Sequence, residues 1–472
     1  MEFENQSEKT VVPKRVLAAL LASVSAGVVP RVGAPYIAIG RQDELRALLN
    51  DLDTVADGGG SMRFIIGKYG SGKSFLLQLI RGYALDAGFL TADADLSPER
   101  RFSGGKGAGV ATYRELLRNL ASRTSAEGGA LPQILARWLS ALQSECAAAG
   151  YLPESAEFSR MVSGKIFALT AELEAQVGGF AFAAVLSAYY RADRDDDEET
   201  KRAALRWLRG EFPTRTEARA ALGVNAVIDD DNWYDYLKLW AVFFRRIGYR
   251  GLVVIVDECV NLYKIPNRIS RENNYEKILS MFNDTLQGKA EGLALLLGGT
   301  PRFLEDERRG LYSYEALRSR LSDDRFAASG YQNLLGPVIR LRRLSDNELL
   351  ALVARIVRLH GQYYGWDVRM SEDEMVRFVT LCLSRAGADS MITPREILRD
   401  LCAMLNILYQ NPDATYDTVV GSAVSLRHGD AENEDAPLPE DDSPTPDGST
   451  PAPAPAQKPK DPAAVTLDDL EF

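Results

Sequence analysis

The chain has 472 residues, which is too long for one average domain, so we expect a main domain with additions. A hydrophobic fraction of 46% is ordinary for a folded protein, and no apolar run reaches the roughly 18 residues that a membrane-spanning helix needs. The net charge is −11, but it is unevenly distributed along the chain.

Histidines and cysteines are few, which argues against a metal centre built from them. The chain has two histidines, and its four cysteines lack metal-ligand spacing (Cys146, Cys259, Cys382 and Cys402). The cysteines are interpreted as reduced core residues, and the polar, acidic N-terminus does not resemble a signal or transit peptide. We therefore expect a cytoplasmic protein without a membrane segment.

The first predicted elements precede the clearest motif of the chain. Residues 1–35 are predicted to form an N-terminal helical segment. The stretch "YIAIGRQDELRALLNDL" then places Gly40 and Arg41 immediately before a helix that contains Glu44 and Leu45.

The stretch "FIIGKYGSGKSFLLQLI", Phe64 to Ile80, has the form of a phosphate-binding loop between a strand and a helix, because residues 67–74 fit G-x-x-x-x-G-K-[ST] without departure. Glycines let backbone N–H groups approach phosphate oxygens, and the helix N-terminus adds positive potential. Lys73 is expected to reach the β- and γ-phosphates, and Ser74 to coordinate Mg²⁺. The alternative is a glycine-rich turn, which the flanking strand and helix argue against. We predict a nucleotide site formed by Gly67, Lys68, Tyr69, Gly70, Ser71, Gly72, Lys73, Ser74 and Phe75.

Residues 103–246 are predicted to form a helical insertion. The stretches "VATYRELLRNLASR", "LPQILARWLSALQSECAAA" and "MVSGKIFALTAELEAQV" indicate helices, and "DRDDDEET" indicates an acidic loop. The sequence does not tell whether this insertion contacts DNA or protein.

The stretch "GLVVIVDECVNLY" predicts a second strand at the nucleotide site. Its unbroken hydrophobicity is what a strand covered on both faces requires, and it ends in Asp257 and Glu258. Asp257 is expected to hold Mg²⁺, and Glu258 to act as the general base that activates water. The alternative is an acidic strand end in a turn.

A third buried strand, in "GLALLLGGTPRFL", ends in Thr300, and "YSYEALRSRLSD" follows it with Arg318 and Arg320. Thr300 is a candidate for positioning the attacking water, although a threonine before proline also ends strands for local reasons. One of the two arginines is a candidate arginine finger, which would neutralise charge at a neighbouring subunit's nucleotide. Since residues at i and i+2 point to different faces of a helix, at most one of them takes this role. The alternative for both is a surface arginine.

Residues 341–428 are predicted to form an all-helical lid. Two of its helices begin with capping boxes, Ser345 with Glu348 and Ser371 with Glu374. Arg395 follows Pro394 at the start of a later helix, from which it is expected to fold over the bound nucleotide. The alternative is a solvated arginine in the first turn.

Residues 429–472 are predicted to form a disordered acidic tail. From Gly429 onward, twelve acidic residues stand against Lys458 and Lys460, so the rest of the chain carries a net charge of only −1. The segment holds nine of the 21 prolines and cannot bury enough apolar surface to fold. Hydrophobic residues return in its tip, Thr466–Phe472, which resembles the C-terminal tail of bacterial single-stranded-DNA-binding proteins. The tip is expected to dock a partner, and a frayed terminus is the alternative.

The order of "AIGRQDEL", "GKYGSGKS", "VVIVDE", "LGGT", "LRSRL" and "TPRE" resembles that of AAA+ ATPases, specifically their origin-recognition and STAND-like branch. This implies an α/β fold with an additional-strand, parallel P-loop core in residues 36–102 and 247–340. Several further stretches, including "SVSAGVVPRVG", "DADLSPERRFSG" and "RRIGYRGLVVIVDE", are similar to BREX-type phage-defence ATP-binding proteins. Unlike origin-recognition ATPases, this chain leaves too few residues between Arg395 and its tail for a winged-helix DNA-binding domain.

These observations support three functions. The first is a Mg²⁺-dependent ATPase that acts as a motor or switch in bacterial phage defence, as a homo-oligomer, together with a helicase or another DNA-processing partner. The second is a DNA-dependent ATPase that grips DNA itself, for which a basic face within the near-neutral body is required. The third is a STAND-like signalling scaffold that binds nucleotide with little turnover. An ATPase assay with and without DNA separates the three.

Overall fold

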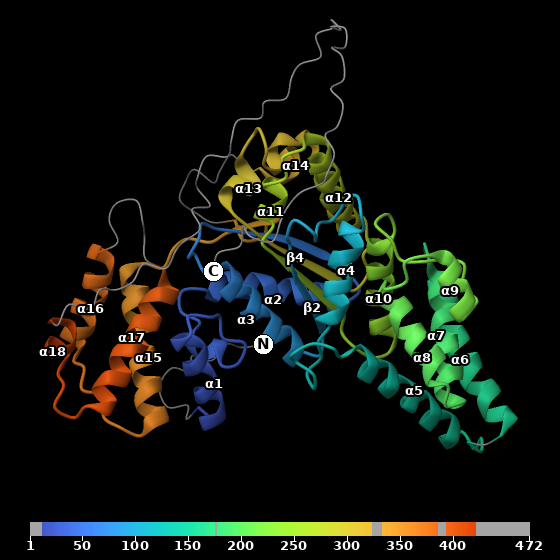
Figure 1. The fold of residues 1–472 in the computed structure, drawn as a ribbon, viewed down its shortest axis with the longest axis horizontal. Helices are drawn as coiled ribbons and strands as arrows, with labels where there is room; N and C mark the ends of the chain where they lie inside the picture. The colour runs from blue at the N-terminus through green and yellow to red at the C-terminus, as the bar shows by residue number, and fades with distance from the viewer. Residues whose placement is uncertain (1–11, 154, 175–176, 323–332, 386–392, 422–472) are drawn as a thin grey trace, which may run out of the picture. The chain divides into compact units, whose positions relative to one another are not determined.

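The computed structural model of the protein describes residues 12–153, 155–174, 177–322, 333–385 and 393–421 (Figure 1). All of these residues belong to one compact unit, Met1–Glu434. The predicted acidic tail, residues 429–472, and its hydrophobic tip lie outside the described residues.

A five-stranded parallel sheet forms the centre of this unit, in the order β2-β3-β4-β1-β5. The prediction of an α/β fold around a parallel sheet is therefore confirmed. Strand β4 lies between β1 and β3, which places its end beside the ends of both predicted motif strands. The strand bounds are β1 (Ser61–Ile66), β2 (Leu90–Asp95), β3 (Leu252–Asp257), β4 (Leu293–Gly299) and β5 (Val338–Arg340).

Helices cover both faces of the sheet, which explains why its central strands β3 and β4 are almost continuously apolar. Ile65, Val253 and Leu296 share a core with α2 (Gln42–Ala56) and α3 (Lys73–Asp86) on one face. The alternate residues Phe64, Val254 and Leu295 belong to the core of the other face. That face is covered by α4 (Ala108–Arg118), α10 (Trp233–Arg246) and α12 (Arg268–Leu286).

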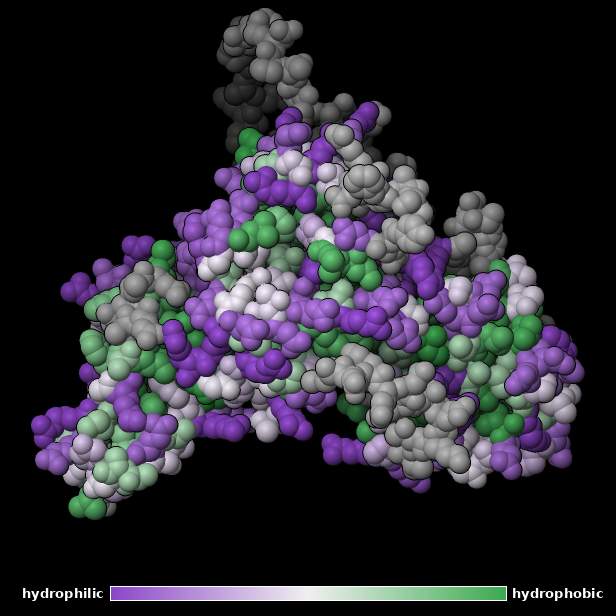
Figure 2. Space-filling view, turned by 180° about the vertical axis from the view of Figure 1, so that it is seen from behind, coloured by the Kyte–Doolittle hydropathy of each residue, from purple (hydrophilic) through white to green (hydrophobic). Residues whose placement is uncertain are grey.

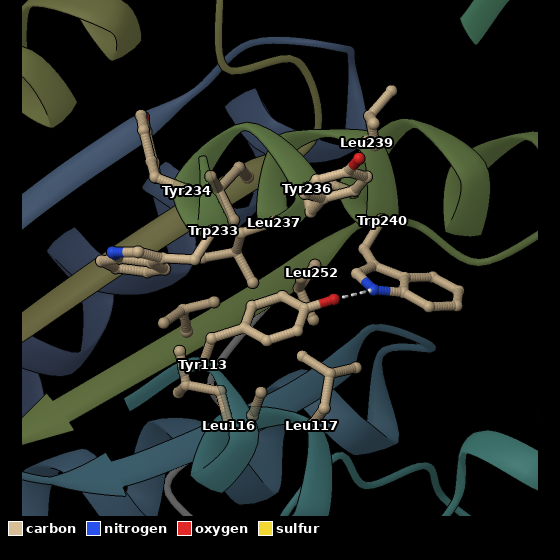
Figure 3. Close-up of a cluster of buried hydrophobic side chains, with 14 of the residues drawn as sticks. Tyr113, Leu116, Leu117, Trp233, Tyr234, Tyr236, Leu237, Leu239, Trp240 and Leu252 are labelled. Atoms are coloured by element: carbon tan, nitrogen blue, oxygen red, sulfur yellow. Dashed lines mark hydrogen bonds between the residues drawn. The ribbon is translucent and has the colours of Figure 1, made fainter. Parts of the chain in front are cut away.

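The interval 103–246 is helical, and its two ends pack directly on the sheet through α4 and α10. Trp240 on α10 donates a hydrogen bond of 2.9 Å to the Tyr113 hydroxyl on α4, which donates one of 2.7 Å to the Leu208 carbonyl. Figure 3 shows these side chains in a continuous cluster with Leu252 of β3. The insertion therefore shares one hydrophobic core with the sheet. Its remaining helices are α5 (Leu131–Ala148), α6 (Ala156–Glu174), α7 (Gly179–Arg194), α8 (Glu198–Leu208) and α9 (Arg215–Leu222).

The C-terminal helices form a second core together with the N-terminal helix α1 (Lys14–Ser25). Helix α1 packs against α15 (Asp346–Tyr364) and α17 (Pro394–Gln410), far away in the sequence. Both predicted capping boxes are present, since Ser345 and Ser371 each exchange hydrogen bonds with the glutamate three residues later. The other helices are α16 (Glu372–Arg385), α18 (Tyr416–Gly421), α11 (Val260–Tyr263), α13 (Pro301–Glu305), α14 (Glu315–Leu321) and the 3₁₀ turns η1 (Ala34–Ile37) and η2 (Leu311–Ser313).

No helix among the described residues is long and apolar enough to cross a membrane. Seen from behind, the face of the molecule shows large hydrophilic areas with smaller hydrophobic areas between them (Figure 2). The four cysteines are free and buried, as the sequence indicated.

Candidate nucleotide site

The predicted phosphate-binding loop connects the end of β1 to the start of α3. Gly70 and Gly72 adopt positive φ angles of 72° and 88°, which side chains rarely tolerate, so the tight loop depends on glycine there. A Cβ atom on Gly67 would lie 2.2 Å from the Ser71 hydroxyl oxygen, so this position also needs glycine. The Ser71 hydroxyl is buried and has no hydrogen-bond partner among the described residues. The loop is thus a narrow cradle in which the Ser71 hydroxyl still lacks a hydrogen-bond partner.

Lys73 and Ser74, the first residues of α3, point back toward the ends of the strands. The Lys73 ammonium donates hydrogen bonds to the carbonyls of Gly67, at 2.8 Å, and Lys68, at 3.3 Å, and so lies across the loop. The Ser74 hydroxyl donates a hydrogen bond of 2.7 Å to Oδ2 of Asp257 on β3. The structure therefore brings together the two residues that the sequence assigned to a metal, although 183 positions separate them.

Strand β3 ends with Asp257 held in place from two sides. Its Oδ1 atom accepts a hydrogen bond of 2.9 Å from the backbone N–H of Glu258. Glu258 has a φ of 57°, a left-handed conformation that costs a non-glycine residue of order 1–3 kcal/mol. Such strain persists where the surrounding structure imposes it, and it concentrates at functional sites. The Glu258 side chain is exposed and lines the cavity described next.

A cavity of about 220 Å³ opens in front of the loop. Its polar lining includes residues of the loop, Asp257, Glu258 and Thr300. The N-terminal residues of α17 approach the loop, because a Cβ on Gly70 would lie 2.8 Å from Cγ2 of Thr393. Its apolar lining comes from the segment after α1 and from the C-terminal helices, through Val28, Val29, Pro30, Ile39, Leu344, Leu352 and Leu398. A cavity that combines a phosphate cradle with apolar side chains has the two surfaces that a nucleotide requires.

Residues 12–423 match the protein family described as BREX system ATP-binding protein BrxC/D. The chain belongs to this family. No curated protein matches the sequence. The family description gives the chain its ligand, ATP, and its setting, the BREX defence system with its other components as partners.

The residues around Asp257 fit a magnesium ion delivered with ATP. Among the described residues, no group of three or more His, Cys, Asp or Glu side chains is arranged to hold a metal alone. Mg²⁺ in nucleotide sites is held by one or two protein oxygens together with waters and phosphates. The Ser74 hydroxyl and the Asp257 carboxylate supply such a pair of oxygens within hydrogen-bond distance of each other.

Thr300 and Arg395, two further predicted site residues of this BREX family member, both line the cavity in front of the loop. Thr300 is only 8% exposed, and its side-chain oxygen caps α13 by accepting a hydrogen bond of 3.3 Å from the Phe303 N–H. The capping accounts locally for a threonine at this place, and its role toward water stays a prediction. Arg395 lies in the first turn of α17 with an exposed side chain, and its role also stays a prediction.

Arg318 and Arg320, on α14, are not among the described residues that line the cavity of their own chain. Arg318 donates a hydrogen bond of 2.7 Å to the Glu307 carboxylate, and Arg320 donates one of 2.7 Å to the Ala316 carbonyl. Both side chains are exposed, so either can meet a second molecule.

Arg41 is a cavity residue to which the sequence interpretation gave no role. Its guanidinium is 3% exposed and donates hydrogen bonds of 2.6 Å to the Ser71 carbonyl and 2.8 Å to the Arg342 carbonyl. Burial lowers the pKa of this guanidinium from its usual value, and the nearby Glu44 opposes the shift.

The Arg342 side chain in turn donates two hydrogen bonds of 2.6 Å to Glu348 at the start of α15, which lower the Glu348 pKa to about 2. These contacts connect the phosphate loop to the C-terminal helices. In the sequence, the feature that points to Arg41 is the Gly40-Arg41 pair immediately before a helix.

Proposed function

We propose that this BREX protein is a Mg²⁺-dependent ATPase of the AAA+ type, acting as a motor or switch in the cytoplasm. The observation that carries the proposal is the 2.7 Å hydrogen bond between Ser74 and Asp257, because it joins the phosphate loop to the carboxylate that a hydrolytic site needs. Glu258 adds a second carboxylate at the same cavity.

The proposed reaction assigns one role to each group. Lys73 binds the β- and γ-phosphates, while Ser74 and Asp257 hold Mg²⁺, which neutralises phosphate charge when bound. Glu258 accepts a proton from water as the water oxygen forms a bond to the γ-phosphorus. The bond from that phosphorus to the bridging oxygen breaks, and the bridging oxygen leaves with ADP. Thr300 orients the water at the end of β4.

Two features of the fold support the AAA+ assignment. Strand β4 lies between β1 and β3, as in additional-strand ATPases, and carries Thr300 directly after its last residue. A helical subdomain follows β5 and contributes Thr393 and Arg395 to the cavity. We assign residues 36–102 and 247–340 to the core, 103–246 to the insertion and 341–428 to the lid.

The exposed positions of Arg318 and Arg320 support an oligomeric active unit. Neither guanidinium reaches the cavity of its own chain, so an arginine finger from α14 would serve the ATP of a neighbouring subunit. We propose a homo-oligomer whose sites lie between subunits. A helicase or another BREX component would be the partner that the ATPase drives, docked through Thr466–Phe472.

The proposal is tested by measuring ATP binding and phosphate release for Lys73→Ala and Glu258→Gln. Lys73→Ala should abolish binding, because the phosphates lose their cation. Glu258→Gln should bind ATP and fail to release phosphate, because only the base is lost. The exposed residues Lys289 and Glu276, which lie away from the cavity, give the controls Lys289→Ala and Glu276→Gln. Equal turnover in Glu258→Gln and wild type would refute the proposal, and tight binding without turnover in the wild type would favour the signalling scaffold.

A further inference from the structure

The outer helices of the insertion, α8 and α9, carry a local excess of positive charge. From the start of α8 to the end of α9, residues 198–222 contain six basic and four acidic side chains, a net charge of +2, in a body that is otherwise near neutral. Five of these basic residues form no ion pair and no side-chain hydrogen bond within the part of the chain that the structure describes: Arg202, Arg206, Arg209, Arg215 and Arg219. We call these five residues the arginine surface. By contrast, many arginines elsewhere, such as Arg63 and Arg245, are paired with a carboxylate.

The first three arginines form a stripe on the solvent side of α8. They follow one another at i, i+4 and i+7, so they lie on one face of the helix and its C-terminal end. The buried residues of α8 are Ala204, Trp207 and Leu208, which lie on the opposite face. Packing of the helix therefore directs the three guanidinium groups away from the core.

Local contacts hold both helices of the arginine surface in place. The Arg206 guanidinium stacks 4.9 Å above the ring of Phe212, which is itself buried. Thr214 caps α9 by accepting a hydrogen bond of 3.2 Å from the Glu217 N–H. Helix α9 buries only Ala218 and half-buries Leu222, so most of its residues are exposed. Arg215 and Arg219, at i and i+4, share one flank of it, and Glu217 lies on the other.

Charge and the lack of apolar area together indicate the chemistry of the partner. None of the exposed large hydrophobic residues lies within 181–268, all of which the structure describes. The core of a protein–protein interface is depleted in charge and rich in aromatic and apolar side chains. Nucleic-acid interfaces are more polar and much more positive. We infer that the arginine surface binds the phosphate backbone of nucleic acid.

The spacing of the stripe fits this ligand. Seven residues of α-helix span about 10 Å, and one strand of a duplex presents a phosphate about every 3.4 Å of axis. Arg202, Arg206 and Arg209 thus face about three phosphates. Their contacts carry no base information, so binding is expected to be independent of sequence and strongly dependent on salt. The inference goes beyond the proposed ATP hydrolysis, and either can fail without the other.

The experiment measures binding of a fluorescent duplex oligonucleotide to the full chain, by anisotropy, between about 50 and 200 mM salt. The test variant is Arg202→Gln/Arg206→Gln/Arg209→Gln. The control is Arg137→Gln/Arg160→Gln/Arg191→Gln, which removes the same charge from exposed positions on α5, α6 and α7. Thermal unfolding and ATP affinity are measured for each variant, so that any loss of stability from removing the Arg206 stack on the buried Phe212 ring is separated from the loss of phosphate contacts.

The test variant should lose most of its affinity, and the slope of log affinity against log salt should decrease by about three. The control should keep both the affinity and the slope of the wild type within a small margin. The inference is overturned if wild type fails to bind the duplex at low salt, or if test and control variants lose equal affinity. It is also overturned if the test variant still binds the duplex but no longer binds a BREX protein with an acidic surface.

Discussion

Gly298 on β4 lies directly against the carboxylate of Asp257 on β3. A Cβ atom on Gly298 would come within 2.3 Å of Asp257 Oδ1 and 3.1 Å of its carboxyl carbon. The parallel pairing of β3 with β4 leaves room for the carboxylate only because residue 298 has no side chain. The position of the predicted metal ligand therefore depends on a neighbouring strand.

We predict that Gly298→Ala displaces the Asp257 carboxylate and breaks its hydrogen bond with Ser74. The Mg²⁺ concentration needed for half-maximal ATP hydrolysis should rise by about tenfold or more, because a ligand is misplaced. The control is Gly82→Ala within α3, where a Cβ would meet no atom within 4 Å. That change should leave activity intact and stabilise the helix by about 0.5–1 kcal/mol. Unchanged Mg²⁺ dependence in Gly298→Ala would show that Asp257 does not hold the metal.

Arg41 provides a second prediction, on stability. Arg41→Ala leaves the buried carbonyl of Ser71 and the partly buried carbonyl of Arg342 without this donor, so the free energy of unfolding should fall by roughly 2–4 kcal/mol. The control is Arg46→Ala, at an exposed position on α2, which should change the free energy of unfolding by about 0.5 kcal/mol or less. Denaturant titrations of both variants measure the difference. Similar values for the two variants would contradict the role of Arg41 as a buried connection.

The arginine finger gives a third prediction. Arg318 is held by an exposed ion pair with Glu307, which is cheap to break, so this residue is free to reorient toward a neighbour. Replacing the arginine that acts as the finger by alanine should cut turnover about 10³-fold and leave ATP affinity nearly intact. Arg320→Ala is the matched comparison. Mixing the inactive variant with Glu258→Gln should restore part of the activity, and a fully active monomer would exclude sites shared between subunits.

His360 makes the C-terminal helices sensitive to acid. The Trp366 indole donates a hydrogen bond of 3.1 Å to Nδ1 of His360, so the neutral ring carries its proton on Nε2, toward Asn406. Burial lowers the pKa of His360 below its usual value, because the cation is disfavoured inside the helical core. The unfolded chain then binds a proton more readily than the folded chain, so stability should fall as the pH drops below about 6.5.

Thermal unfolding of wild type and His360→Gln between roughly pH 7 and 5 measures this effect. The variant should be less stable at pH 7 and less dependent on pH. The other histidine, His428, lies outside the described residues and gives the control His428→Gln. An equal pH dependence in wild type and His360→Gln would assign the effect to other groups.

The tail gives the last prediction. Deleting Thr466–Phe472 should leave basal ATPase activity unchanged and abolish co-purification of the BREX partner, because the tip carries the hydrophobic residues of the acidic segment. A deletion of equal length within the proline-rich stretch, residues 450–456, is the control. Partner binding that survives loss of the tip would leave the tail as a solubilising linker.

Short stretches of the sequence determined many elements of the fold and of the candidate site. The phosphate loop, the strand ending in Asp257 and Glu258, and the Ser345 and Ser371 capping boxes were predictable because each is set by residues within one short stretch. The parallel sheet was predictable because unbroken apolar strands need cover on both faces. The cores, by contrast, depend on which helices meet.

Only the tertiary structure decided the contacts between distant segments. Helix α1 joins the C-terminal helices rather than the core that follows it, and Arg41 reaches both Ser71 and Arg342. The stripe of Arg202, Arg206 and Arg209 became a surface only once packing of Trp207 fixed which face of α8 is buried. Such contacts arise from burial and hydrogen bonding between residues far apart in sequence, so no local pattern records which segment an apolar or charged face will meet.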